Sequence, residues 1–368
     1  MCFMMQTDLE KLYQFKKKEL KLLSDYRKQL YSRPLLRHFF LELTLRCNER
    51  CLHCGSSCGD VPSEELSLAQ YQDILDQVAE DFDVSTFMLC ITGGEPLLRK
   101  DFFDILGYAN DKGYIWGMTS NGTLITPETA HKLRLAGMKT ISVSIDGLES
   151  SHDAFRQTPG GYKKAMEGIQ NLIDEGGFSH IQVTSVMNHS NMHELDDLYE
   201  IFCDMDIDSW RVIGIEPMGR ALSHPELLLT PEDQERLFDF IREKRMENMP
   251  VTYGCSHFLG LKYEKEVRDH YFTCNAGIYT ASILCNGDIV ACLDIERRPE
   301  LVQGNILKDR FKDVWENKFA FYRQGLDTQC AFCADCDVKE FCAGGAHHSF
   351  DYDRNEQRIC FKDQAFFV

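Results

Sequence analysis

The chain has 368 residues and a formal net charge of −18, and 43% of its residues are hydrophobic. This length and composition allow a substantial core in two domains, or in one barrel with a sizeable appendage. The acidic balance excludes general nucleic-acid binding, and no apolar stretch reaches the roughly 18 residues of a membrane span, so we expect a cytoplasmic protein with neither partner.

Residues 7–32 are rich in lysine and predict a helix. The apolar side chains in this segment are spaced as a single stripe: Leu9, Leu12, Leu20, Leu23, Tyr26 and Leu30. We expect residues 1–36 to form a helical segment that packs on the barrel described below and keeps a solvated basic face. The alternative is that this segment helps to hold an acidic leader peptide.

Three cysteines follow the first predicted strand. Residues 39–46 alternate between apolar and polar side chains, as a half-buried strand does. Cys47, Cys51 and Cys54 then stand at C-x3-C-x2-C spacing, in the loop at the carboxyl end of this strand. Ligands bind at that edge of α/β sheets. Three thiolates in a short loop can hold a four-iron cluster and leave one iron open for a substrate or cofactor.

Strands and helices alternate from residue 39 to about residue 216. Strands are predicted to begin near Phe39, Thr86, Tyr114, Thr140, Ile181 and Trp210. Helices are predicted over residues 68–82, 102–110, 127–136, 162–173 and 192–203. Six such units predict an α/β fold with a parallel sheet and right-handed crossovers, short of a complete eight-fold barrel.

Polar stretches mark the next three strands. Thr92-Gly93-Gly94-Glu95-Pro96 ends the second strand, Thr119-Ser120-Asn121-Gly122 follows the third, and Ser142-Val143-Ser144-Ile145-Asp146-Gly147 lies on the fourth. The fourth strand alternates, with Ser142, Ser144 and Asp146 on one face. This pattern favours a wet or ligand-filled interior over an apolar layer on both sides, although a solvated edge strand would also fit.

These stretches and the cysteine spacing resemble the signature of the radical S-adenosylmethionine (SAM) enzymes. The resemblance implies a partial (β/α)6 TIM-like barrel in which Cys47, Cys51 and Cys54 hold a [4Fe-4S] cluster. It implies that SAM is reductively cleaved there to a 5′-deoxyadenosyl radical, with an electron donor such as flavodoxin or ferredoxin as a partner. Cofactor-binding roles are implied for Gly93, Gly94 and Glu95 at the amino group of SAM and for Asn121 and Ser144 at the ribose.

A second group of cysteines lies near the C-terminus, beyond a domain boundary expected at residue 250. Cys274 and Cys292 fit C-x12-G-x4-C, with Asn286-Gly287 as a hairpin turn between residues 280–284 and 289–291. Cys333, Cys336, Cys342 and Cys360 follow. The pattern resembles the SPASM extension, which carries auxiliary four-iron clusters, so residues 37–250 and 251–368 are expected to be the barrel and a SPASM domain. Structural zinc is the competing interpretation.

One position departs from the SPASM pattern, because Ala346 stands where the last four-cysteine run normally closes. The resemblance implies that Cys333, Cys336, Cys342 and Cys360 hold one complete cluster. It leaves Cys274 and Cys292 with a second cluster that lacks its usual fourth ligand. Cys330 is the leading substitute and Cys255 the next, with Cys285 also open; the alternatives are an open iron or no cluster.

Most SPASM enzymes modify peptides or proteins. The residues 216–221, Glu-Pro-Met-Gly-Arg-Ala, resemble a stretch at the same place in many members of that branch. The leading expectation is therefore a maturase that crosslinks or oxidises side chains of a ribosomally made precursor peptide. One alternative is a radical SAM enzyme for a small molecule such as a porphyrin or an amino acid derivative. The other is a non-enzymatic iron–sulfur or zinc protein.

Overall fold

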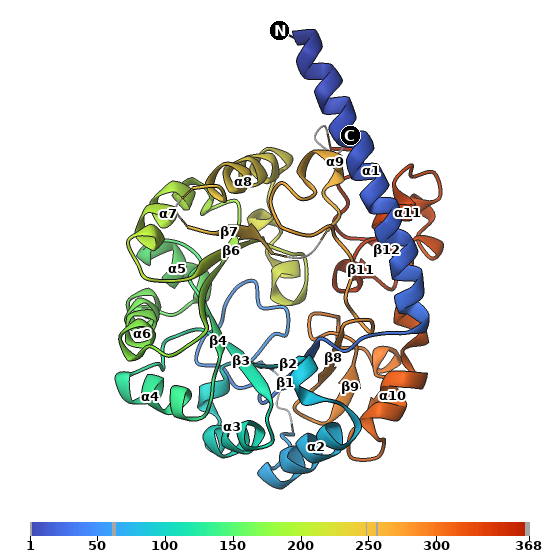
Figure 1. Cartoon of the computed structure of the whole chain (residues 1–368). Helices are drawn as coiled ribbons and strands as arrows, with labels where there is room; N and C mark the ends of the chain where they lie inside the picture. Colours follow the sequence, from blue (N-terminus) through green and yellow to red (C-terminus); the bar gives the residue numbers. More distant parts are fainter. Residues whose placement is uncertain (1, 61–63, 248, 255–256, 365–368) are drawn as a thin grey trace.

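A ten-stranded sheet forms the centre of the molecule, and helices cover its outer face (Figure 1). The computed structural model describes residues 2–60, 64–247, 249–254 and 257–364. The strand order is β10-β9-β8-β1-β2-β3-β4-β5-β6-β7. The strands span β1 His38–Glu42, β2 Met88–Thr92, β3 Ile115–Ser120, β4 Thr140–Ser144, β5 His180–Met187, β6 Ser209–Gly214, β7 Val251–Tyr253, β8 Thr280–Ile283, β9 Asp288–Val290 and β10 Gly304–Asn305.

The helices follow the strands along most of the chain. They span α1 Cys2–Ser32, α2 Leu68–Asp81, α3 Phe102–Asp111, α4 Pro127–Leu135, α5 Glu149–Arg156, α6 Gly161–Glu175, α7 Leu195–Cys203, α8 Pro231–Lys244, α9 Gly260–Tyr263, α10 Phe311–Asn317 and α11 Lys339–Cys342. A separate small sheet pairs β11 Phe350–Asp351 with β12 Glu356–Gln357.

The run from β1 to β7 is parallel throughout, as the alternation of strands and helices predicts. Strand β8 pairs in parallel with the other edge of β1, and β9 and β10 continue from it antiparallel. No pairing joins β7 to β10, so the barrel stays open. The prediction of an α/β fold with a partial barrel is therefore confirmed. The strand β7 and the pairing of β8 with β1 are additions to it.

Five predicted helices are observed as α2, α3, α4, α6 and α7. Helix α2 begins with a capping box, in which Ser67 and Gln70 bond each other's backbone. Helix α5 was not predicted. Its eight residues, Glu-Ser-Ser-His-Asp-Ala-Phe-Arg, are mostly polar and show no apolar stripe at helical spacing.

Alternate strand residues face opposite layers of the barrel. Phe39 and Leu41 of β1 and Leu89 of β2 are fully buried in the layer between sheet and helices. Their neighbours Phe40 and Cys90 line a cavity inside the barrel. Burying the first set stabilises the closure of the helices on the sheet, because each such side chain contributes about 1.5–3 kcal/mol. The second set leaves the interior open for function.

Helix α1 packs along α9 and α11, near the C-terminal part of the chain, rather than on the helices of the barrel (Figure 1). Lys16 is buried and donates to Leu261 O at 2.9 Å. Arg27 is also buried and donates to Phe341 O at 2.9 Å and Glu340 O at 2.6 Å. The expectation of a helix packed on the barrel with a solvated basic face is therefore wrong in its contact surface and for these two residues.

The apolar stripe expected on α1 is divided between two faces. Leu20 and Leu30 are buried, whereas Leu12 and Tyr26 are exposed. The buried face of α1 is the one that carries Lys16 and Arg27, and both side chains have the hydrogen-bond acceptors described above. No helix in the described part of the chain is long and apolar enough to span a membrane.

The predicted hairpin is observed between β8 and β9, with Gly287 at φ +91° in its turn. The positive φ explains why glycine occupies this position. The sheet crosses the boundary expected at residue 250, because β7 pairs with β6 and β8 with β1. The sheet therefore does not divide at residue 250, and the boundary between residues 37–250 and 251–368 stays a prediction.

Candidate active site

The carboxyl ends of the parallel strands surround a cavity of about 350 Å³, here called the loop cavity. Its lining includes the following candidate residues: Cys47, Cys51, Cys54, Gly93, Gly94, Asn121 and Ser144. These residues come from four successive strand ends. The structure therefore brings together in one place all the cysteines expected at the first cluster and four of the five residues expected at SAM.

Two glycines allow the end of β2 to lie against the cysteine loop. Gly94 N donates to Thr44 O at 2.8 Å, and Glu95 N donates to Arg46 O at 2.9 Å. A Cβ atom on Gly93 would lie 2.3 Å from Thr44 O, and one on Gly94 would lie 2.1 Å from Arg46 O. Any other residue would push the two segments apart. The Gly-Gly pair thus positions the cysteine loop through the backbone.

Glu95 lies beneath the loop cavity, where its carboxylate is fully buried. The carboxylate accepts hydrogen bonds from Ser120 Oγ at 3.0 Å, Asn121 N at 2.9 Å and Leu97 N at 3.2 Å. Burial raises the pKa of Glu95 to about 7, against the opposing effect of these hydrogen bonds. The geometry gives Glu95 a role in holding Asn121. Its direct contact with SAM stays a prediction.

Arg220 clamps the cysteine loop from the end of β6. Its backbone N donates to Cys54 O at 3.1 Å, and its guanidinium donates to Cys51 O at 2.8 Å and Cys58 O at 3.1 Å. The adjacent Gly219 has φ +51°, and a Cβ there would lie 2.3 Å from Cys54 O. Gly219 and Arg220 therefore position the cysteine loop, because the backbone and guanidinium of Arg220 bond its carbonyl groups.

A buried ion network, which the sequence analysis did not identify, supports the same loop. Arg156 of the unpredicted helix α5 donates to Glu49 Oε2 at 2.8 Å and to Asp146 Oδ2 at 2.7 Å. All three side chains are buried. Burial alone would raise the pKa of Asp146, but the charge of Arg156 holds it below its usual range. In the sequence, the only signal for this network is the alternation of polar residues that continues from β4 to Asp146.

The residues at the loop cavity fit an iron–sulfur cluster that binds SAM. Burial raises the pKa of Cys47 to about 11, whereas a hydrogen bond from Cys58 is the main cause that lowers the pKa of Cys54 to about 6. Glu49 Oε1 is buried on this lining and has no hydrogen-bond partner among the described residues. Three thiols around a cavity with an unsatisfied carboxylate oxygen match the donors that such a cofactor requires.

A second cavity of about 480 Å³, here called the lumen cavity, lies among the amino-terminal halves of the strands. It shares Thr119, Asp294 and His348 with the loop cavity, so the two cavities adjoin at these residues. There, His348 Nε2 lies 3.9 Å from Glu216 Oε2. The polar face predicted for the fourth strand lies on these cavities, with Ser142 on the lumen cavity and Ser144 on the loop cavity; that the interior holds water or a ligand stays a prediction.

Glu216 is held in its charged form by two histidines. His257 Nε2 lies 2.9 Å from Glu216 Oε1. Burial would raise the pKa of Glu216, but His257 and His348 together hold it below the usual range of a carboxyl. Because His257 also lines the site of the C-terminal cysteines, this group connects the two regions. Sequence reasoning named Glu216 only as part of a motif and did not identify the histidines.

Five C-terminal cysteines line one further cavity: Cys330, Cys333, Cys336, Cys342 and Cys360. Lys339 and Lys362 lie on the same lining, which places positive charge beside the thiols. The four cysteines expected to form a complete cluster are thus brought together. Cys330 is an addition to them, buried and in a hydrogen bond that contributes to the raised pKa of Cys333, after burial.

The remaining pair, Cys274 and Cys292, lies on the lumen cavity together with Ala346. The leading substitute for their missing partner, Cys330, belongs to the other group. Cys285 is buried against Leu45 and Cys58 at the cysteine loop. Position alone therefore removes both as substitutes for the fourth ligand. Cys255, the next candidate, lies outside the described residues.

No group of three or more His, Cys, Asp or Glu side chains in the described ranges could hold a single metal ion. The cysteines lie around cavities at the carboxyl edge of the barrel and in the C-terminal part of the chain. A partial parallel barrel with three cysteines at its carboxyl edge and a cysteine-rich extension defines an iron–sulfur enzyme of the radical type.

Comparisons with known proteins agree with this class. A model described as "Radical SAM superfamily" matches residues 41–202, and the SPASM model, described as "Iron-sulfur cluster-binding domain", matches residues 274–337. The mycofactocin maturase MftC of Mycobacterium ulcerans is 31% identical over 309 residues, which cover 83% of this chain and 81% of that protein. An AdoMet-dependent heme synthase of Methanosarcina barkeri is 29% identical over 321 residues, covering 82% of this chain and 89% of that protein.

Solved structures share the fold at lower identity. Streptococcus suis SuiB bound to S-adenosylmethionine superposes with a TM-score of 0.71 at 16% identity, over 90% of this chain and 78% of that chain. The chain belongs to the radical SAM superfamily and carries a SPASM iron–sulfur domain. It is therefore an enzyme whose cofactors are SAM and [4Fe-4S] clusters, and the expectation of a non-enzymatic cysteine protein is set aside.

Proposed function

We propose that this enzyme oxidises side chains of a ribosomally made precursor peptide, forming a crosslink or an oxidised residue. The observation that carries the proposal is the pair of adjoining cavities, here called the chamber, which reach from the cysteine loop to Cys274 and Cys292. A substrate side chain in this chamber would lie between the SAM site and an auxiliary site. The similarity to MftC supports a maturase, and structures of this fold include SuiB bound to precursor peptide SuiA and anSMEcpe with a bound peptide.

When bound, the cluster and SAM supply a 5′-deoxyadenosyl radical that removes a hydrogen atom from an unactivated carbon. Cys47, Cys51 and Cys54 would hold that cluster, and an external donor such as flavodoxin or ferredoxin would reduce it. Gly93 and Gly94 would present backbone groups to the amino end of SAM. Asn121 and Ser144 would face the ribose, because both line the loop cavity.

Residues at the junction would handle substrate and protons. His348 and Glu216 place an imidazole and a carboxylate beside the path between the two cavities. The Glu216–His348 pair there can accept the proton that a substrate radical releases when it loses an electron. The buried Arg156 network holds the loop behind the cysteines and excludes water from that side.

A tetrapyrrole is the second candidate substrate. The heme synthase of M. barkeri covers 82% of this chain, and an Fe-coproporphyrin III synthase of the same organism is 29% identical over 203 residues. The lumen cavity is lined by His38, His180 and Arg211, side chains that suit carboxylate groups. A porphyrin carries such groups, so this lining favours the second candidate specifically.

One experiment separates the candidates. The reconstituted, reduced protein is incubated with SAM and either an iron porphyrin or the peptide encoded by a short reading frame beside the gene. A mass change in the peptide, absent with Cys51→Ala, supports the peptide proposal. Conversion of the porphyrin with no change in any peptide would replace it with the second candidate.

A further inference from the structure

The position of Ala346 leaves room for another ligand beside Cys274 and Cys292. Ala346 is only 1% exposed and lines the lumen cavity together with both cysteines. The next residue, His347, lines the same cavity and is 3% exposed. A third thiol on this lining, Cys90, belongs to strand β2 and lies 3.7 Å from Met88 O. The imidazole is therefore the nitrogen donor next to the vacant ligand position.

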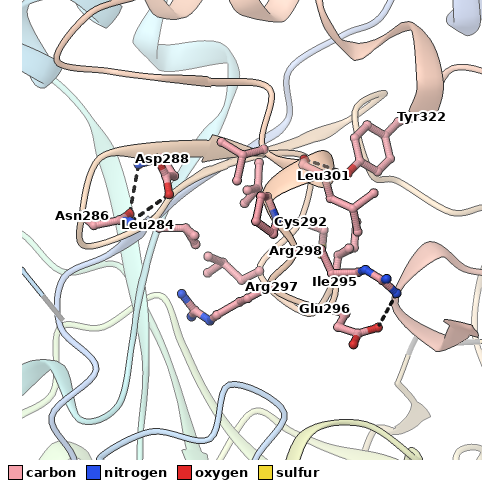
Figure 2. A pocket seen from close by; sticks show the side chains of 14 residues that line it. Leu284, Asn286, Asp288, Cys292, Ile295, Glu296, Arg297, Arg298, Leu301 and Tyr322 are labelled. Atoms are coloured by element: carbon pink, nitrogen blue, oxygen red, sulfur yellow. Dashed lines mark hydrogen bonds and ion pairs between the residues drawn. The ribbon is translucent and has the colours of Figure 1, made fainter. Parts of the chain in front are cut away.

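Two tyrosines fix the place of His347 relative to the cysteines. The ring of Tyr322 meets the His347 ring edge to face, with centroids 4.8 Å apart, and Tyr352 OH lies 3.1 Å from His347 Nδ1. Both phenols lie within electrostatic range of Cys274 and of Cys292. Figure 2 shows Tyr322 and Cys292 on one lining, that of the cavity beside the β8–β9 hairpin. His347 and Tyr322 also line a small cavity together with Cys274.

The contacts of Tyr352 define the tautomer of His347 that a metal ligand would need. Tyr352 OH lies 3.2 Å from His347 O and 3.1 Å from His347 Nδ1. When the hydroxyl donates to the carbonyl it accepts from Nδ1, which then carries the proton and leaves Nε2 with its lone pair. Metal-binding histidines are commonly oriented in this way, by a hydrogen bond from the other ring nitrogen.

The neighbouring histidine faces a different site. His348 Nε2 lies 3.9 Å from Glu216 Oε2, and His348 lines the loop cavity, which His347 does not. His348 lines the lumen cavity as well, but its imidazole is paired with Glu216. This pairing makes His347, and not His348, the candidate ligand.

We propose that His347 Nε2 is a ligand of an auxiliary iron–sulfur cluster held by Cys274 and Cys292. The inference rests on the proposed cluster assignment and adds to it a mixed thiolate–imidazole site. The fourth iron would stay open for the substrate. Replacing a thiolate by a neutral imidazole makes a cluster easier to reduce, as in sites where histidine replaces cysteine. Such a cluster would be well suited to accept the electron left on an oxidised substrate.

The test is pulsed EPR of the reduced, reconstituted protein, prepared with natural and with ¹⁵N-labelled histidine. Wild type should hold about twelve irons per chain and show a strong nitrogen coupling that changes with the isotope. His347→Ala should lose that coupling and about four irons. His347→Ala combined with Ala346→Cys should regain the irons without the coupling, which shows that the protein still folds. His180→Asn, which changes another histidine of the same cavity, should keep both.

The contrary outcomes are distinct. Full iron content with no histidine coupling in wild type, or coupling that persists in His347→Ala, overturns the inference. So does a wild-type content of about eight irons, because the Cys274 site would then be empty. SAM cleavage by the wild type is measured separately in each case, so the proposed function is tested independently of the His347 ligand. Loss of SAM cleavage in the wild type, with the coupling present, would contradict the function alone.

Discussion

Arg156 is the residue on which the charge balance beneath the cysteine loop depends. Its guanidinium lies between Glu49 and Asp146, and none of the three groups reaches solvent appreciably. Such a buried group adds little stability over an apolar replacement of the whole set, but removing one partner leaves a charge uncompensated. Because Glu49 lies between Cys47 and Cys51, the network also sets the shape of the loop.

We therefore expect Arg156→Met to lower the free energy of unfolding by about 3–5 kcal/mol. Urea unfolding measures this change. Arg310→Met serves as the control, since Arg310 is exposed and pairs only with Glu80 and Asp81 at the surface. A midpoint for Arg156→Met equal to that of the control would mean that the network does not support the fold.

Glu95 should act on SAM through Asn121. In Glu95→Gln, an amide NH₂ replaces one carboxylate oxygen, so the side chain can no longer accept from Ser120 and Asn121 at one oxygen and from Leu97 N at the other. We expect SAM binding to weaken by about 1.5–3 kcal/mol, the range for a hydrogen bond to a charged group. Calorimetric titration with SAM measures this loss of affinity. An unchanged affinity with a lower Tm would instead assign Glu95 only to capping the turn at Pro96.

At the level of elements, strand ends and the glycines between them create the site. The backbone of β2 can bond the segment after β1 only because residues 93 and 94 lack side chains. The Gly-Gly pair thereby lets the end of β2 hold the cysteine loop in place. This explains, in physical terms, why a Gly-Gly pair stands between a strand and a carboxylate.

Gly94→Ala should displace the cysteine loop, since the new Cβ would lie 2.1 Å from Arg46 O. The expected result is a loss of iron from the first cluster and of SAM cleavage, with the secondary structure retained. Gly107→Ala is a matched control: no atom lies within 4 Å of its Cβ position in helix α3. It should leave iron content unchanged and gain up to about 1 kcal/mol of stability. Equal iron content in both variants would contradict the positioning role.

Periodic elements were predictable, and contacts between distant segments were not. Strands β1–β6 and the helices α2, α3, α4, α6 and α7 follow from alternation and apolar stripes. Helix α5 was missed because it is short and polar, and with it the partner of Asp146. The buried face of α1 was predicted incorrectly. Lys16 and Arg27 lie on it and donate to carbonyl groups far away in the sequence, which no local pattern reveals.

The same limit applies to the cysteines. Spacing grouped Cys47, Cys51 and Cys54 correctly, since they lie within eight residues of one loop. It could not separate Cys285 from Cys330, because their places depend on β8 pairing with β1 and on the fold after α10. Nor could spacing indicate His347, since only the fold brings its imidazole to Cys274 and Cys292.

At the scale of the whole molecule, two adjoining cavities lie inside the barrel, and each carries cysteines that we propose as cluster ligands. The loop cavity faces the cysteines at the carboxyl ends of the strands, and the lumen cavity reaches the SPASM cysteines. A substrate held between them can lose a hydrogen atom at one end and an electron at the other. The open edge between β7 and β10 is consistent with a substrate larger than the chamber itself.

The most direct measurement is the amount of 5′-deoxyadenosine formed from SAM by the anaerobically reconstituted, reduced protein. We predict formation by the wild type and by Cys58→Ser, because a fourth thiolate is not needed at that cluster. We predict none from Cys47→Ala, Cys51→Ala or Cys54→Ala, since each removes one of only three ligands. Cleavage at the wild-type rate in any of these three variants, or none in the wild type, would contradict the assignment of the loop cavity.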